Sequence, residues 1–323
     1  MSTHSVATRL STRMTLAIVL VLAAGFAAEA ADTIRLLTAR PGWQAGLAWY
    51  ARDRGLWQKH NLEVQHTSLD TSAAAMEAFV SGRGDVAVVN VGVAVNAFFR
   101  GVPIRIIAGT PVADYPLFAT SPDIRELKDL KGRKIAVFSI PSDATMALEL
   151  VLQKQNLVVN RDFSYVRVPA PNICETVKRG QADAGVVFEP YGSACIVDGA
   201  KRIGGAGAVS FDPPKLIPSS VIVVNAKFLD QHRDAIARFL RAAGEAVAWA
   251  GANKAEAVAQ LAKHSGEAEP AIALSYDTVK FSLDVDLAFH KIMLDRYLDV
   301  KLLPRAPTRN DMETLYKLDL LRR

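Results

Sequence analysis

Hydrophobic and polar residues follow one pattern along this chain that occurs twice, in the same order. In each copy a helical segment ends at Gln-Lys-x-Asn-Leu, at residues 58–62 and again at residues 153–157. A second helical segment is then stopped by glycine, and an aspartate three residues later opens a buried apolar strand, at residues 82–89 and 180–187. Glycine after a helix and aspartate before a strand are ordinary punctuation when they occur alone. Their matched order predicts two similar α/β lobes.

Apolar runs predict the strands of the two lobes, and apolar repeats of three and four predict the helices. In the first lobe we expect strands at 33–37, 62–66, 86–89 and 103–109, and helices at 45–59, 71–79 and 90–100. In the second lobe we expect strands at 134–138, 165–168 and 184–188, and helices at 142–155 and 172–180. A returning strand at 219–225 and helices at 228–250, 254–264 and 283–298 should pack on the first lobe.

Polar residues at the helix starts predict capping interactions. Asp70 or Thr71 should cap the second helix of the first lobe, and Asn90 should cap the third. Asn172 and Glu175 have the spacing of a capping box.

The order of elements requires the chain to cross between the lobes twice. We expect the first lobe at 31–115 and 217–323, and the second lobe at 116–216. Residues 112–121, which contain Pro116 and are flanked by Pro111 and Pro122, and residues 213–220 would form the two hinges. Each lobe should be a mostly parallel sheet flanked by helices, with a ligand cleft between the lobes at the carboxyl ends of the strands.

The N-terminal residues read as a cleaved secretory signal peptide. Arg9 and Arg13 precede an apolar run at 14–26, and Ala-Glu-Ala at 28–30 supplies a cleavage pattern. An uncleaved anchor is the alternative, but the run is short for a membrane span. No cysteine follows the run, so a lipoprotein attachment is excluded, and we expect a free protein in the periplasm or outside the cell.

Charge and cysteine content narrow the function further. The formal charge is +5, and the basic residues are scattered without interleaved aromatic residues, which argues against a nucleic-acid surface. Cys174 and Cys195 are the two cysteines. They allow a disulfide in an oxidising compartment, with two free thiols as the alternative, and they are too few for a metal site.

Four segments resemble a known family. They are Gly-Leu-Trp-Gln-Lys-His-Asn-Leu-Glu-Val at 55–64, Ser-Gly-x-Gly-Asp-Val-Ala at 81–87, Asp-Leu-Lys-Gly-Arg-Lys-Ile-Ala-Val at 129–137, and Gly-Gln-Ala-Asp-Ala at 180–184. The chain resembles the substrate-binding proteins of ABC importers of the nitrate, sulfonate and taurine type, which share the SsuA/THI5-like domain. The resemblance implies a type II periplasmic-binding-protein fold that closes on a small molecule and presents it to a membrane permease. It also implies that the ATPase is a separate subunit, and no phosphate-binding loop is found here: the Gly-rich residues 204–207 lack the Lys-Ser/Thr continuation.

Helix starts and crossing segments supply the candidate ligand contacts. Free N–H groups at helix N-termini suit carboxylate, sulfonate or nitrate, although each polar residue there also serves as an ordinary cap. Trp43 could stack on the ligand body. Glu189 follows a buried strand, so it either pairs with a protein cation, reaches water or holds a ligand N–H. The expected ligand-binding residues are Thr38, Gly42, Trp43, Gln44, Asn90, Val91, Tyr115, Ser139, Ser142, Asp143, Thr145, Glu189 and Ser219.

These observations favour a monomeric uptake protein that needs no cofactor and no metal. We expect a small anionic organic solute, with a pyrimidine or another nitrogen-containing solute as the alternative. A sensor that serves a separate membrane receptor is a further alternative. An exported enzyme is disfavoured because the sequence contains neither His-Glu-x-x-His nor Gly-x-Ser-x-Gly.

Overall fold

A computed structural model describes residues 30–39, 42–204 and 216–322. The expected signal peptide lies outside the described residues except for its last position, as do most of the Gly-rich segment at 204–207 and the first part of the second hinge. Among the described residues no helix is long and apolar enough to cross a membrane.

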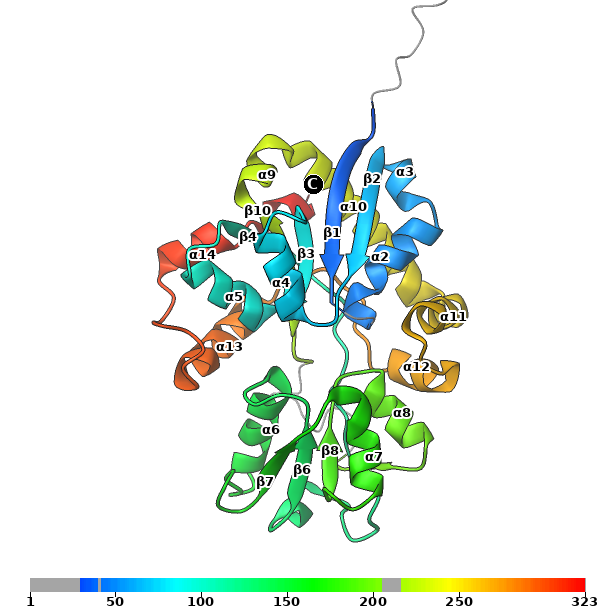
Figure 1. The fold of residues 1–323 in the computed structure, drawn as a ribbon, viewed down its shortest axis with the longest axis vertical. Helices are drawn as coiled ribbons and strands as arrows, with labels where there is room; N and C mark the ends of the chain where they lie inside the picture. The colour runs from blue at the N-terminus through cyan, green and yellow to red at the C-terminus, as the bar shows by residue number, and fades with distance from the viewer. Residues whose placement is uncertain (1–29, 40–41, 205–215, 323) are drawn as a thin grey trace, which may run out of the picture.

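The chain forms two lobes, each built on a mixed five-stranded sheet (Figure 1). The first sheet has the order β2-β1-β3-β10-β4, and the second has the order β7-β6-β8-β5-β9. In the first sheet β2, β1 and β3 are parallel while β10 is antiparallel to both of its neighbours. The second sheet repeats this scheme, with β5 as its antiparallel strand. The expected α/β fold of two mostly parallel sheets is therefore confirmed.

The first lobe contains both ends of the described chain. Its strands are β1 (Asp32–Thr38), β2 (Leu62–Ser68), β3 (Val86–Asn90), β4 (Ile104–Gly109) and β10 (Ser220–Asn225). Its first helices are α2 (Trp43–Asp53), α3 (Leu56–Lys59), α4 (Ser72–Val80) and α5 (Val91–Phe99). Its later helices are α9 (Ala226–Gln231), α10 (Arg233–Ala252), α11 (Lys254–Ser265), α12 (Glu269–Tyr276), α13 (Leu287–Asp299), α14 (Arg309–Leu315) and η3 (Leu318–Arg322).

The second lobe is smaller. Its strands are β5 (Leu117–Ala119), β6 (Lys134–Val137), β7 (Ser164–Arg167), β8 (Ala184–Val186) and β9 (Lys201–Arg202). Its helices are η1 (Leu127–Leu130), α6 (Asp143–Gln153), η2 (Ala170–Asn172), α7 (Ile173–Lys178) and α8 (Tyr191–Val197). The chain enters this lobe between β4 and β5 and leaves it between β9 and β10.

The repeated sequence motifs form the same local structures in both lobes. Asn61 and Asn156 each adopt positive φ, 52° and 59°, which turns the chain after a helix. Asp85 accepts a hydrogen bond from the backbone N–H of Arg35, and Asp183 accepts one from the backbone N–H of Lys134. Asp85 thus ties the start of β3 to β1, and Asp183 ties the start of β8 to β6.

Several predicted boundaries were wrong for local reasons. The helix expected at 45–59 is two helices, because Gly55 has φ of 66° between α2 and α3. The helix expected at 228–250 is likewise divided at His232 into α9 and α10, and α12 was not expected. Asn90 and Asn172 occupy N-cap positions without a side-chain capping bond, whereas Thr71 caps α4 as predicted.

The two lobes touch on both sides of the connecting segments. Helix α12 of the first lobe lies against α8 of the second (Figure 1). A single cluster of packed apolar side chains includes Val91 and Tyr297 of the first lobe and Val137 and Ala144 of the second. The region between the lobes is therefore continuous with both cores, and the site described next lies there.

Candidate functional site

A cavity of about 760 Å³ lies between the two lobes. Helices α4 and α5 of the first lobe form one wall, and residues 138–143 of the second lobe form the other. Tyr115, on the first crossing, and Tyr297, on α13, complete the lining. The apolar lining residues are Ala73, Met76, Val80, Val93, Ala97, Val102, Phe138, Pro141 and Leu302, and the polar ones include Glu77, Ser81, Asn90, Asn96, Arg100, Ser139, Ser142 and Asp143. The cavity is large enough for a small organic molecule and is mainly apolar.

A hydrogen bond joins the lobes at this cavity. The Tyr297 hydroxyl donates to Asp143 Oδ1 at 2.5 Å. Both side chains are buried, and burial raises the pKa of Asp143 to about 6, although the Tyr297 hydroxyl opposes the shift. Burial, together with the charge of Asp143, also raises the pKa of Tyr297 well above its usual range. The contact couples the start of α6 to α13, so it depends on the lobes lying close together.

The N-terminus of α5 opens on the same cavity. Gly92 and Val93 line the cavity from the first turn of α5, where backbone N–H groups have no acceptor within the helix. A Cβ added at Gly92 would stand 3.2 Å from the Tyr297 ring, so Tyr297 packs directly on this helix start. The helix end can therefore present N–H donors to a ligand oxygen.

Asn90 holds this corner of the cavity together. Its Oδ1 accepts a hydrogen bond from Ser72 Oγ at 2.5 Å, and its Nδ2 donates to the carbonyl oxygen of Ser219 at 3.2 Å. The backbone N–H of Val91 also donates to the Ser219 carbonyl oxygen. Asn90 thus lines the cavity while its amide ties together β3, the start of α4 and the chain just before β10.

Ser142 and Thr145 form the capping box of α6. Ser142 Oγ accepts from the Thr145 N–H at 3.2 Å, and Thr145 Oγ1 accepts from the Ser142 N–H at 2.8 Å. Thr145 is buried and does not line the cavity, whereas Ser139 and Ser142 do. The capping interaction fixes the α6 start and hence the position of Asp143.

Trp43 is an expected ligand contact that the structure places in the core of the first lobe. Its side chain is fully buried in the core of the first lobe, where its ring packs edge-on against Tyr276 and Phe281. Its Nε1–H donates to Ser275 Oγ at 2.8 Å. Trp43 occupies the inward face of α2, so it packs in the core and does not line the cavity.

Glu189 is satisfied by the protein and does not line the cavity. Its carboxylate accepts from the Ser193 hydroxyl at 2.8 Å and from the Ser193 N–H at 2.9 Å. Arg202 lies 3.4 Å from Glu189 and 3.3 Å from Asp114, which sits on the first crossing. Burial raises the pKa of Glu189 to about 7 in spite of these partners. The sequence left open whether Glu189 pairs with a protein cation, reaches water or holds a ligand N–H. In the structure it pairs with a protein cation, Arg202.

The remaining predicted residues divide between the cavity wall and its surroundings. Tyr115 lines the cavity and shares a side-chain hydrogen bond with Ser219. Thr38 is buried and its hydroxyl lies 2.9 Å from His66 Nε2. The cavity brings together Asn90, Tyr115, Ser139, Ser142 and Asp143, and it does not include Thr38, Gly42, Trp43, Gln44, Val91, Thr145, Glu189 or Ser219.

Sequence reasoning missed the contributions of α4 and α13. Met76 of α4 and Tyr297 of α13 line the cavity, yet nothing near them in the sequence signals a ligand site. Tyr297 is 154 residues from its partner Asp143. The apolar periodicity of α13 predicted only that the helix would pack on the first lobe.

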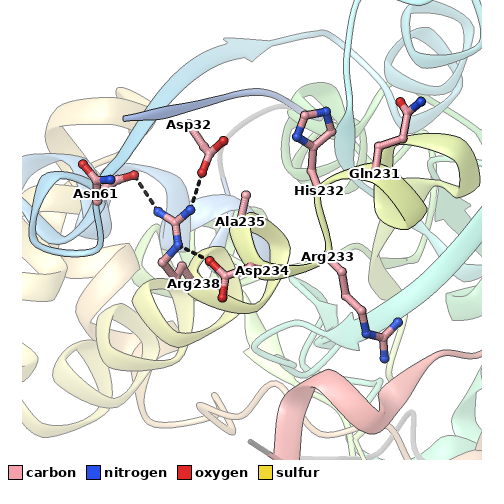
Figure 2. Close-up of a pocket in the computed structure, with 8 residues that line it drawn as sticks. All are labelled: Asp32, Asn61, Gln231, His232, Arg233, Asp234, Ala235 and Arg238. Carbon is pink, nitrogen blue, oxygen red and sulfur yellow. Dashed lines mark hydrogen bonds and ion pairs between the residues drawn. The ribbon is translucent and has the colours of Figure 1, made fainter. Parts of the chain in front are cut away.

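A second, more polar hollow lies on the first lobe, away from the cavity (Figure 2). Its volume is about 480 Å³, and Arg238 is its central cation. The guanidinium donates to the carboxylates of Asp32 and Asp234 and to the Asn61 carbonyl oxygen. Arg238 therefore secures the start of β1 to α10, and the hollow contains a solvent-exposed ion-pair network.

Cys174 and Cys195 are free thiols in the structure, with their side chains in contact. Burial raises the pKa of the Cys195 thiol. Within the described ranges no group of three or more His, Cys, Asp or Glu side chains is placed to hold a metal ion.

The architecture is that of the two-lobe solute-binding proteins. It resembles the periplasmic aliphatic sulphonate binding protein SsuA from Escherichia coli, with a TM-score of 0.74 and 19% identity over 88% of this chain and 91% of that one. It also resembles the periplasmic nitrate-binding protein NrtA from Synechocystis PCC 6803, with a TM-score of 0.74 and 16% identity over 90% of this chain and 88% of that one.

The chain belongs to the NMT1/THI5-like family, whose model matches residues 45–257. A "Putative binding protein" of Brucella abortus strain 2308 is 24% identical to it over 221 residues, which is 68% of each chain. The family resemblance expected from the sequence motifs is thus confirmed.

Proposed function

We propose that this protein is the solute-binding component of an ABC uptake system in the periplasm. It binds a small organic solute between its lobes, closes around it by rotation at the two crossings, and delivers it to a membrane permease. The ATPase of such a system is a separate chain. The observation that carries the proposal is the cavity of about 760 Å³ that both lobes line.

The contacts between the lobes suit this mechanism. The bond from Tyr297 to Asp143 forms only when the lobes are close, and both residues line the cavity. A solute in the cavity would contact both lobes at once, so it would bind the closed arrangement more tightly than the open one. The named ligands of the structural relatives, a sulphonate and nitrate, support a solute of this size range.

The lining favours an organic anion over a bare oxyanion. The N–H groups at the start of α5 suit an anionic oxygen, while Met76, Val93 and Phe138 suit an apolar body. Nitrate has no apolar body to place against these side chains. We therefore propose a sulfonate or carboxylate that carries a short organic chain.

A thermal-shift screen over sulfonates, carboxylates, nitrate and pyrimidines tests the proposal, followed by calorimetric titration of each compound that shifts the melting temperature. A solute at a hundred times its Kd should stabilise the protein by about 2.7 kcal/mol, which is a shift of several degrees. Mass spectrometry of the recovered solute should find it unchanged. Conversion of the solute to a product, or the absence of any shift across the panel, would contradict the proposal.

A further inference from the structure

Asp143 is a buried acid, and only one of its two carboxylate oxygens accepts a hydrogen bond within the described protein. It is the first residue of α6, its side chain lines the interlobe cavity, and only 8% of its surface is exposed. Oδ1 accepts the hydrogen bond from Tyr297. Oδ2 accepts no hydrogen bond from any residue within 30–39, 42–204 or 216–322. Asp143 lines the cavity, so this second carboxylate oxygen is left without a donor from the described protein next to the space for a ligand.

Other buried acids of this chain are matched by a cation. Asp85 pairs with the Arg35 guanidinium at 2.6 Å, and Arg202 lies within ion-pair distance of Glu189 and Asp114. No Lys, Arg or His among the described residues forms an ion pair with Asp143, and no cation contributes to its pKa. A buried carboxylate without a cation is costly, so its presence in the cavity indicates a role in ligand binding.

The surroundings of Asp143 restrict which ligand group can neutralise its negative charge. Tyr115, Phe138 and Tyr297 line the same cavity and supply aromatic side chains to its mainly apolar lining. Across the described chain, no second carboxylate or histidine joins Asp143 to make a metal site. A protonated nitrogen fits such a place, because it supplies both a positive charge and N–H donors, and aromatic faces attract it as well.

We propose that the solute carries a protonated amine, or another N–H donor of that strength, which binds Asp143 Oδ2. This inference rests on the proposed function and narrows its substrate class. The solute would be amphoteric, with its anionic group at the start of α5, its nitrogen at the start of α6 and its apolar body between the two. The ionic bond to α6 and the oxygen contact to α5 would then draw the two lobes together.

The test compares matched pairs of compounds that differ only in the nitrogen. Suitable pairs are 2-aminoethanesulfonate with 1-propanesulfonate, 4-aminobutanoate with pentanoate, and an aminopyrimidine with the methylpyrimidine of the same substitution pattern. Calorimetric titration of the wild-type protein should give, in at least one pair, an affinity about 10- to 100-fold higher for the nitrogen compound. This arm requires no mutation, so a folding defect cannot obscure it.

The second arm uses Asp143→Asn, which keeps the shape of the side chain and removes its charge. This variant should lose the preference for the nitrogen compound, so that the two members of each pair bind it with affinities within about twofold of each other. Glu175→Gln is the matched control, because Glu175 is also a first-turn acid of a second-lobe helix but is exposed to solvent. The control should keep the full preference.

The outcomes distinguish a failure of this inference from a failure of the proposed function. Equal affinities within every pair, with at least one compound bound, overturn the inference and leave the proposed function standing. A preference that survives in Asp143→Asn also overturns the inference, because Asp143 is then not the recognising group. Failure of all six compounds to bind contradicts the proposed solute class and this inference together.

Discussion

Replacing Asp143 with Asn should stabilise the solute-free protein at neutral pH and not at acidic pH. Burial raises the pKa of this carboxyl from 3.8 to about 6, so the folded protein holds its proton more tightly than the unfolded chain does. The contribution of Asp143 to wild-type stability should therefore fall as the pH rises from about 4 to about 6, and this loss should stay constant above that range. Asn has no charge to bury, so the variant avoids the loss.

The magnitude follows from the size of that shift. Each pKa unit corresponds to about 1.4 kcal/mol, so the ionised carboxyl costs the folded protein about 3 kcal/mol. Because the side chain is only 8% exposed, screening by solvent reduces this figure little. The position at the N-terminus of α6 favours the negative charge by about 0.3–1 kcal/mol, which makes about 3 kcal/mol an upper value. The amide oxygen of Asn can still accept the bond from Tyr297.

Urea denaturation of both proteins at a series of pH values between 4 and 8 measures this effect. Other titrating groups contribute equally to wild type and variant, so they cancel in the difference between the two free energies of unfolding. That difference should be near zero at pH 4 and should rise to its full value above pH 6. A difference that does not change with pH, or a variant less stable than wild type at pH 8, would refute the reasoning, since the charge of Asp143 would then be compensated within the protein.

Three further substitutions test other parts of the structure. Trp43→Phe should lower the free energy of unfolding by about 2 kcal/mol, because it removes the bond to Ser275 and ring volume from the core, while calorimetry should find solute affinity unchanged. Tyr297→Phe should weaken solute binding about tenfold, because the bond to Asp143 across the lobes is lost; an unchanged Kd would exclude that bond from the closed state. Glu189→Gln should leave the Kd for the solute unchanged, because Glu189 does not line the cavity. Because burial raises the pKa of Glu189 from 4.5 to about 7, the gain in stability from this substitution should be larger at pH 8 than at pH 4 by up to about 3 kcal/mol. Weaker solute binding by this variant would show that Glu189 belongs to the binding site.

Local sequence patterns determined the two-lobe architecture. Asn61 and Asn156 turn the chain at positive φ, and Asp85 and Asp183 accept hydrogen bonds from backbone N–H groups of β1 and β6, the neighbouring strands in their own sheets. These interactions join residues at similar places in two copies of one motif. They depend on backbone geometry and on short polar side chains, which is why a repeat in the sequence was sufficient to predict two similar sheets.

The candidate site could be predicted only in part, because it depends on side-chain orientation and not on local backbone geometry alone. Helix starts could be recognised, so Asn90, Ser142 and Asp143 were named, and all three line the cavity. The sequence could not tell which way each side chain would point. Trp43 and Glu189 looked equally exposed to a ligand, yet the phase of α2 buries the first, and Ser193 and Arg202 satisfy the second.

The sequence by itself determined the family, the repeated lobes and the helix starts that border the cleft, because short sequence patterns indicate all of these. Only the tertiary structure decided that α13 of the first lobe would place Tyr297 against Asp143 of the second, 154 residues away. That contact depends on how the C-terminal helices pack against the first lobe and how the two lobes meet. Packing of this kind is a property of the whole fold, and no local pattern records it.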